Sequence, residues 1–207
     1  MRVPASATLK LVMVLTLMFG CSGLMAQQFP FDFWHEGKAV LESQDTLRGK
    51  IKYDPQNDLI QMEIKGRFET LTSRKVLFFE IFDQSLNNYR QFYTLPYSAI
   101  GGYRTPTFFE LLTEGKITLL SKETLEYRNT NTGYFYGTVS RLVLVYRYYL
   151  LREDGSITAL DGTKSQFLSL MGAKEDEVRK YMKANRLGLD RRIEIVRVLA
   201  YYNSLFQ

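Results

Sequence analysis

The chain has very few of the residues that metal sites and catalytic sites most often use. Its 207 residues include one cysteine, Cys21, and one histidine, His35. A typical zinc site needs three or four Cys, His or carboxylate ligands, and a Ser-His-Asp triad would have to use His35. His35-Glu36 begins like the HExxH zinc motif, but Ala39 stands where the second histidine is required. The sequence therefore predicts no metal, no cofactor and no identifiable catalytic residue.

Phosphate-binding and nucleic-acid-binding patterns are also absent from the sequence. Gly-Lys pairs begin at Gly37, Gly49 and Gly115. None has the second Gly five residues earlier, or the Ser or Thr after the Lys, that a phosphate-binding loop requires. The net charge is +5, yet acidic and basic residues alternate along the chain instead of gathering in one stretch. We therefore expect no nucleic-acid partner.

The first 26 residues have the order of a secretory signal peptide. Two basic residues precede an apolar run, Leu11–Phe19, which is about half the ~20 residues that a membrane-spanning helix needs. Small residues follow, and cleavage after Ala26 fits the usual rule for the cleavage site. Lipidation at Cys21 is the alternative, and it would give a membrane-anchored lipoprotein. We expect residues 1–26 to direct export to the periplasm or the outer-membrane surface.

Removal of this segment would leave an exported protein without cysteine. No disulfide could then form, so the fold would have to be held by its core. The chain has 14 Phe and 14 Tyr, which supply large apolar side chains for such a core. Cleavage would also remove Arg2 and Lys10 and so lower the formal net charge from +5 to +3. The high isoelectric point is therefore no evidence for a nucleic-acid partner.

The region 27–162 has the patterns of antiparallel β-hairpins. Ile60, Met62 and Ile64 alternate with polar residues, which is typical of a half-buried strand. Pro106–Ser121 reads as two strands joined by a tight turn at Glu114-Gly115. Val76–Phe82 is almost continuously apolar, which favours a central strand covered on both faces. We predict a curved antiparallel sheet or an incomplete barrel.

The periodicity changes near residue 163. Thr163 and Gln166 fit a capping box at the start of a helix. A second helix is predicted over Glu175–Asn185, and Asp190 is a good N-cap for a third. The sequence thus predicts an α+β protein in which residues 27–162 form a β-rich domain and residues 163–207 form a segment of three short helices docked on it.

Two groups of aromatic residues are candidates for a binding surface. Tyr134, Phe135 and Tyr136 lie between Gly133 and Gly137, in a segment predicted to be a loop over 129–137. The alternative is that this trio begins the next strand and packs in the core. The second group is Tyr97 and Tyr103, which flank Gly101-Gly102.

Several stretches of the chain resemble a group of uncharacterised exported bacterial proteins. They are Arg74–Asp83, Tyr89–Ser98, Pro106–Ser121, Met171–Leu189 and Ala200–Leu205. The resemblance implies export and a β-rich domain with a C-terminal helical segment. It implies no activity and no site residues, because none of these stretches is a catalytic signature.

The function that these observations favour is binding. We expect a non-catalytic, exported cell-envelope protein whose partner is an envelope protein or a surface glycan. One alternative is a carboxylate-dependent hydrolase of envelope glycans, since carboxylate pairs are recognised by their separation in space and not in sequence. A small outer-membrane β-barrel is a further alternative, because alternating strands and a signal peptide are compatible with one. Contact with a membrane is expected only through a lipid anchor at Cys21.

Overall fold

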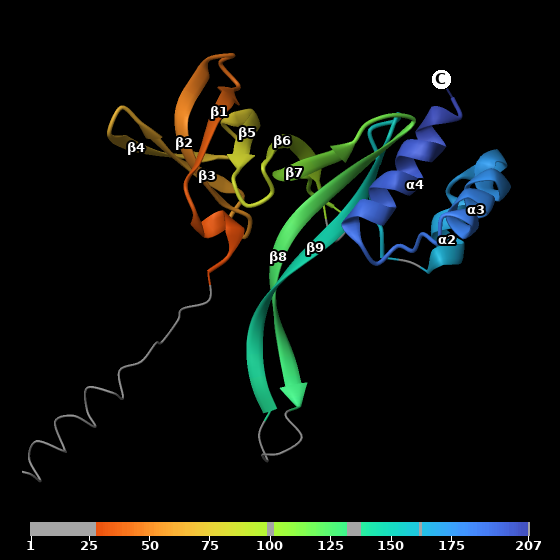
Figure 1. Cartoon of the computed structure of the whole chain (residues 1–207). Coiled ribbons are helices and arrows are strands. Elements are labelled where there is room, and N and C mark those ends of the chain that lie inside the picture. Colours follow the sequence, from red (N-terminus) through yellow and green to blue (C-terminus); the bar gives the residue numbers. More distant parts are fainter. Residues whose placement is uncertain (1–27, 99–101, 132–137, 162, 207) are drawn as a thin grey trace, which may run out of the picture.

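The computed structural model of the chain describes residues 28–98, 102–131, 138–161 and 163–206. These residues form a ten-stranded antiparallel sheet followed by a few C-terminal helices, which is a β-rich α+β fold (Figure 1). The strands are β1 (His35–Leu41), β2 (Thr46–Asp54), β3 (Leu59–Ile64), β4 (Arg67–Thr72), β5 (Val76–Asp83), β6 (Asn88–Tyr97), β7 (Thr105–Thr113), β8 (Ile117–Asn131), β9 (Thr138–Arg152) and β10 (Ile157–Ala159). A short 3-10 helix, η1 (Pro30–Asp32), precedes β1.

The sheet is open, and its strand order is β10-β9-β8-β7-β6-β5-β1-β2-β3-β4. The hairpin predicted over Pro106–Ser121 is present as β7–β8, and β1–β2 and β3–β4 also form hairpins. β5 lies between β6 and β1, which confirms its predicted central position. The prediction that both of its faces are covered was wrong, because Leu77 is 45% exposed and the buried residues of β5 are mainly on one face. The sheet edges are therefore β4 and β10, and β4 is the longer of the two.

The sheet curves around a core of apolar side chains from its β1–β7 portion. This core consists of Ala39, Ile51, Tyr53, Ile60, Met62, Leu71, Val76, Phe79, Ile81, Phe92 and Phe108. Asp58, in the turn between β2 and β3, accepts hydrogen bonds from the Phe108 backbone N–H at 3.1 Å and from the Lys122 ammonium group at 2.5 Å. These bonds hold the β2–β3 turn against β7 and β8. The edge strands β4 and β10 do not pair with each other, so the sheet stays open.

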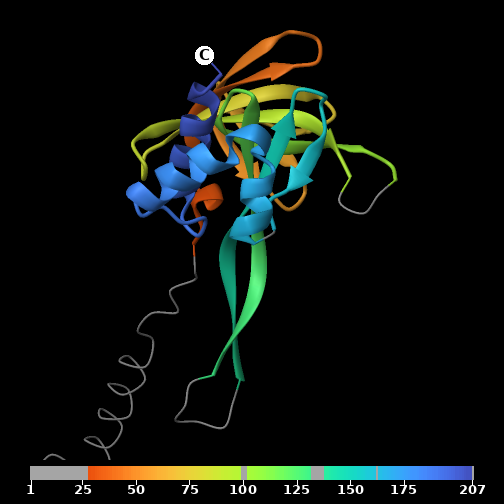
Figure 2. The same ribbon diagram turned by 90° about the vertical axis from the view of Figure 1, so that its right-hand side faces the viewer.

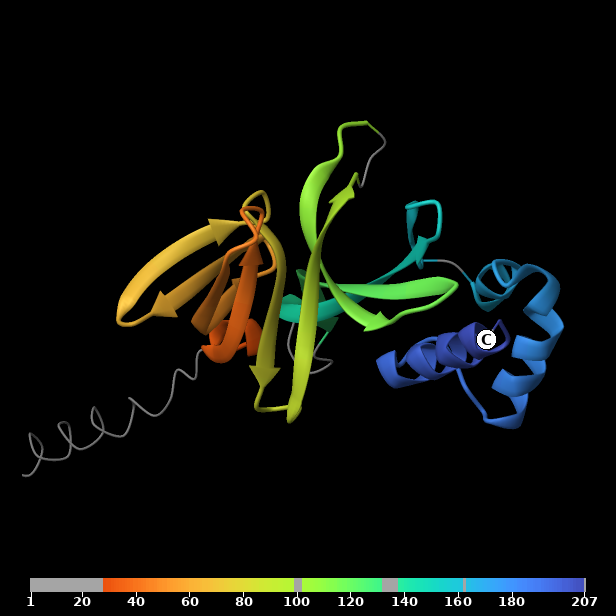
Figure 3. The same cartoon turned by 90° about the horizontal axis from the view of Figure 1, so that it is seen from above.

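The C-terminal helices lie at the end of the molecule opposite β1–β4 (Figures 1 and 3). They are α2 (Lys164–Ser169), α3 (Glu175–Ala184) and α4 (Arg192–Ser204), with a 3-10 turn, η2 (Gly172–Lys174), between α2 and α3. The predicted capping box is present, because Thr163 and Gln166 satisfy each other's backbone N–H groups. The prediction for Asp190 was wrong, since Arg191 is the N-cap of α4. The Glu194 carboxylate instead reaches back to the Gly188 N–H, at 2.6 Å.

The helices cover the part of the sheet formed by β8 and β9 (Figure 2). Their apolar faces share a buried cluster with Ile117, Leu119 and Leu150 of the sheet. Asn203 of α4 adds a polar connection. Its side-chain amide accepts from the Ile117 N–H at 3.1 Å and donates to the Ile117 carbonyl at 2.9 Å. Gly115 permits this approach, because a Cβ atom there would lie 2.4 Å from the Asn203 side chain.

Replacing Asn203 by Ala is therefore expected to destabilise the protein. The change would leave the buried backbone groups of Ile117 without partners, at a cost of about 1–3 kcal/mol. Ser204→Ala is the matched control on the next, exposed position, with an expected change within about 0.5 kcal/mol. Urea unfolding of the two variants measures the difference. Equal stability of both variants would show that Asn203 does not hold α4 to the sheet.

Proline does not end β6, because the strand continues to Tyr97 and Pro96 lies opposite Pro106 of β7. Residues 129–131, which were predicted to lie in a loop, belong to β8, and the rest of that predicted loop, 132–137, lies outside the described residues. None of the helices in the described ranges is long and apolar enough to cross a membrane.

Candidate functional site

A two-stranded arm projects from the body of the protein (Figures 1 and 2). β7 pairs with β8 only as far as Ser121, and β10 pairs with β9 only at residues 149–151. Beyond these points β8 and β9 pair only with each other in the described sheet, over residues 122–131 and 138–147. We call these two segments the arm. Each of its strands has one backbone edge that no other described strand covers.

The arm has one apolar face and one charged face. Side chains alternate across a strand, so Leu125 and Tyr127 share a face with their cross-strand partners Leu144 and Leu142. Tyr127 is 77% exposed, and none of these four residues belongs to a buried core cluster. The opposite face carries Val143 and Val145 together with charged residues, which are Lys122, Glu126, Arg128, Arg141 and Arg147. Glu126 and Arg147 form an ion pair at 2.5 Å.

A buried ionic cluster lies where the arm leaves the body. Arg90 of β6 donates to both carboxylate oxygens of Glu110 of β7, at 3.0 and 2.9 Å, and to Glu123 of β8 at 2.5 Å. Arg192 at the start of α4 donates to the same two Glu110 oxygens, at 2.6 and 2.9 Å. Asp83 of β5 lies 3.5 Å from Arg90. One network therefore joins four strands and a helix at the root of the arm.

The two glutamates of this cluster differ in their ionisation. Burial opposes the charge on Glu110, but the hydrogen bonds and charge of Arg90, and then those of Arg192, hold the pKa of Glu110 below its usual range. Burial raises the pKa of Glu123, and the attraction of Arg90 only partly offsets this effect. Two guanidinium groups face three carboxyl groups, so the cluster has one acid more than it can neutralise. Within the described residues, Glu123 Oε2 has no hydrogen-bond partner.

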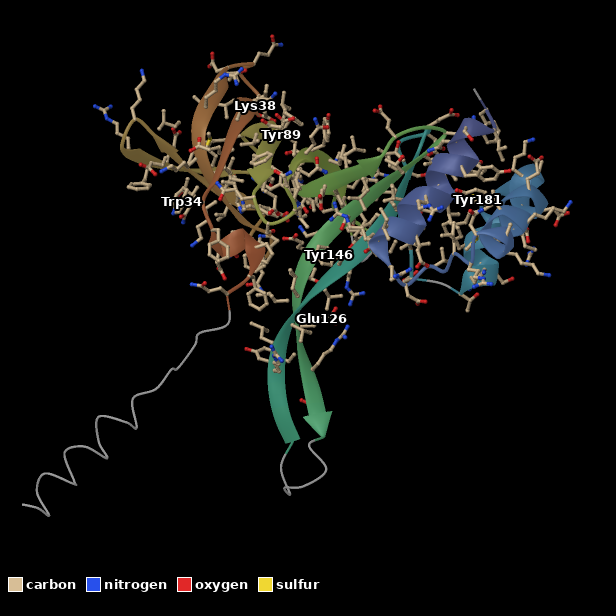
Figure 4. The ribbon with its side chains drawn as sticks, in the orientation of Figure 1. Trp34, Lys38, Tyr89, Glu126, Tyr146 and Tyr181 are labelled. Carbon is tan, nitrogen blue, oxygen red and sulfur yellow. The ribbon has the colours of Figure 1, made fainter. Side chains whose placement is uncertain are left out.

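The chemistry that this cluster can perform is limited by its burial. A general acid or base must come within hydrogen-bond reach of its substrate. Glu110 and Glu123 are each 2% exposed, and their bonded oxygens face arginines. Arg192 also lies with its guanidinium carbon 6.0 Å from the ring centroid of Tyr146 on the arm (Figure 4). The geometry is that of a support which fixes the root of the arm.

A pocket of about 420 Å³ lies beside the root of the arm. Leu125 forms its wall on the arm, and Phe29 and Phe31 close it from the N-terminal segment. The two phenyl rings are stacked, with their centroids 5.4 Å apart. The remaining lining is mostly polar and comes from η1, β2, the turn after it and β3, as Asp32, Lys52, Tyr53, Asp54, Gln56 and Gln61. The apolar face of the arm is therefore continuous with a concave surface on the body.

The structure separates the aromatic residues singled out from the sequence. Tyr134, Phe135, Tyr136 and Cys21 lie outside the described residues. Tyr97 packs edge-on against Phe109 and Tyr149, with ring centroids 5.4 and 5.3 Å away. Tyr103 is 83% exposed in the segment before β7. The ring of Tyr97 is thus engaged within the sheet, whereas that of Tyr103 faces solvent.

The ionic cluster has a signal in the sequence, which is a charged residue two positions from a buried phenylalanine on the same strand. Arg90 lies two residues from Phe92, Glu110 lies two residues from Phe108, and both phenylalanines are buried. A charge that shares a strand face with buried apolar residues must find a partner, because an unpaired buried charge is costly.

Within the described ranges, no three His, Cys, Asp or Glu side chains are grouped so that they could hold a metal ion.

Comparison with known proteins finds no matching family model, no matching curated protein and no matching solved structure. What the chain does must therefore be inferred from its own residues and their geometry.

Proposed function

We propose that this is a non-catalytic, exported cell-envelope protein that binds another protein through the apolar face and free edges of the arm. One observation carries the proposal: a two-stranded ribbon extends from the body with an apolar face on which Tyr127 is exposed and Leu125, Leu142 and Leu144 are half-buried, outside the core clusters of the described residues.

The physical properties of the arm support a protein partner. An isolated two-stranded hairpin is at best marginally stable in water. Its free backbone edges present N–H and C=O groups that an extended segment of a partner can pair with. Leu125, Tyr127, Leu142 and Leu144 offer apolar area along the same ribbon. Main-chain pairing would supply affinity, and these side chains would supply specificity.

Export is part of the proposal and rests on the sequence of residues 1–26. Cleavage after Ala26 is expected to give a mature protein that begins at Gln27. Expression of the full chain in a bacterial host, followed by N-terminal sequencing, tests this expectation. An acylated Cys21 would indicate a lipid anchor instead, and an intact Met1 would contradict export by either route.

The arm is tested by measuring whether its apolar face is covered in the cell. The expected mature chain has no cysteine, so a Tyr127→Cys variant would carry a single thiol. We expect a thiol-reactive maleimide to label this variant readily when purified, and at least about fivefold more slowly in the intact envelope of the source cells. Ile193→Cys is the control, because Ile193 is 62% exposed and belongs to α4, not to the arm. Equal labelling of Tyr127→Cys in both settings would contradict a bound partner.

A further inference from the structure

An aromatic groove lies beside η1, on the outer side of the β-rich body. Phe33 and Trp34 line this groove, which has a volume of about 390 Å³. Trp34 is 37% exposed, and its ring centroid lies 5.7 Å from that of Phe68, which is 71% exposed on β4. Figure 4 shows Trp34 apart from Glu126 and Tyr146, which mark the arm. The groove is thus a second surface, separate from the arm.

The groove is held in place by buried polar contacts. The imidazole ring of His35 lies between two carbonyl oxygens, with Nε2 3.0 Å from that of Pro30 and Nδ1 3.3 Å from that of Phe82. These contacts fix the segment that carries Trp34 against β5. The Asp83 carboxylate accepts from the Ser85 hydroxyl at 2.6 Å and from the Ser85 N–H at 2.9 Å. The floor of the groove is therefore already formed without a ligand.

The hydrogen-bonding groups at the groove are mostly uncharged. Gln28, Gln84 and Ser85 are exposed and line it with amide and hydroxyl groups. Asp83 is the one carboxylate of the lining, and it is buried and bonded to Ser85 and Arg90. A ligand that fits must offer a flat apolar surface to the aromatic rings and neutral hydroxyl or amide groups to the rim. A strongly charged ligand would find no free opposite charge among these residues.

We propose that this groove binds a neutral oligosaccharide, with a sugar ring stacked on Trp34 and its hydroxyl groups bonded to Gln84, Gln28 and Ser85. The C–H face of a pyranose is apolar and flat, so it can stack on the aromatic ring of Trp34. The hydroxyl groups around the pyranose can then bond to the amide and hydroxyl groups that line the groove. Together with the arm, the site would let the protein hold a glycan with one surface and a protein with another. The inference does not depend on the arm having a partner.

A second copy of the chain is the competing occupant, because β4 is a sheet edge and carries Phe68. The saccharide is favoured because the groove is lined by Gln28 and Gln84 as well as Trp34, and no residue of β4 is part of its lining. Pairing of two β4 strands would cover Phe68 and leave these amides unused.

The test uses the fluorescence of Trp34, which is the only tryptophan in the chain. The mature protein is titrated with cellopentaose, chitopentaose and maltopentaose, and with a tetragalacturonate as the charged comparison. We expect saturable quenching or a blue shift with at least one neutral oligosaccharide, and a weaker response to the galacturonate. No response to any neutral oligosaccharide would overturn the proposal, and so would a response to the galacturonate alone. A spectrum that changes with protein concentration only would indicate self-association instead.

Variants then assign any response to the groove. Isothermal titration with the responding oligosaccharide should show roughly tenfold or greater loss of affinity for Trp34→Ala, as for an aromatic hot spot. Gln84→Ala should also weaken binding. Tyr103→Ala is the matched control, since it removes an exposed aromatic ring elsewhere and should leave the affinity unchanged. Binding that survives both groove variants would place the saccharide at another site and overturn the proposal.

Discussion

Replacing Arg90 by Met is expected to destabilise the protein by about 3–5 kcal/mol, which is the usual cost of breaking a buried ion pair by removing one partner. Met has a similar length but no charge. Glu123 would lose its only hydrogen-bonded cation within the described residues, and Glu110 would retain Arg192 alone. Equilibrium unfolding in urea at neutral pH measures the loss directly.

Arg179→Met is the matched control for this prediction. Arg179 forms an ion pair with Glu175 on the exposed surface of α3, and such pairs contribute little. We expect its replacement to change the free energy of unfolding by less than about 1 kcal/mol. If Arg90→Met unfolded at the same urea concentration as Arg179→Met, the cluster could not be the support of the arm.

The two glutamates of the cluster are expected to respond differently to the same substitution. Glu110→Gln removes the carboxylate that both Arg90 and Arg192 hold, so we expect a loss of about 3–5 kcal/mol at pH 7. Glu123→Gln removes a carboxyl group whose charged form the fold disfavours. Arg90 and Arg192 would then face two carboxylates instead of three. We expect this variant to remain within about 1 kcal/mol of the unmodified protein.

The dependence of stability on pH separates the two residues further. The pKa of Glu110 is lowered in the fold, so its contribution is complete above the ordinary glutamate pKa and is lost as the pH falls through the lowered value. The pKa of Glu123 is raised, so stability falls as the pH rises from the ordinary glutamate pKa through the raised value. The free energy of unfolding of Glu123→Gln should therefore rise relative to that of the unmodified protein as the pH rises through this window. A relative rise on acidification instead would contradict a raised pKa for Glu123.

Much of the fold follows from short-range patterns in the sequence. Ile60, Met62 and Ile64 predict β3 because their side chains alternate, and the turn at Gly115 predicts the β7–β8 hairpin. The Thr163 capping box likewise predicts the start of α2, because it depends on residues only three positions apart. Features of this kind are local, so one sequence is enough to find them.

The features that define the candidate site are not local. Arg90 and Glu123 are 33 residues apart, and Arg192 and Glu110 are 82 residues apart. The arm exists because β7 and β10 stop pairing before β8 and β9 end, which no pattern within β8 or β9 reveals. The sequence singled out Tyr134, Phe135 and Tyr136, which come between β8 and β9 in the chain, but the apolar face along Leu142 and Leu144 could be recognised only from the strand register.

The claim that the apolar face of the arm binds a protein is tested most directly by photo-crosslinking in the source cells. A photoreactive phenylalanine analogue at Tyr127 is predicted to give a crosslinked product of discrete mass. Leu142→Ser with Leu144→Ser should abolish this product, whereas Val143→Ser with Val145→Ser, on the opposite face, should leave it. The account would be contradicted if the product were missing, if it formed equally from position 193, or if both double variants affected it alike.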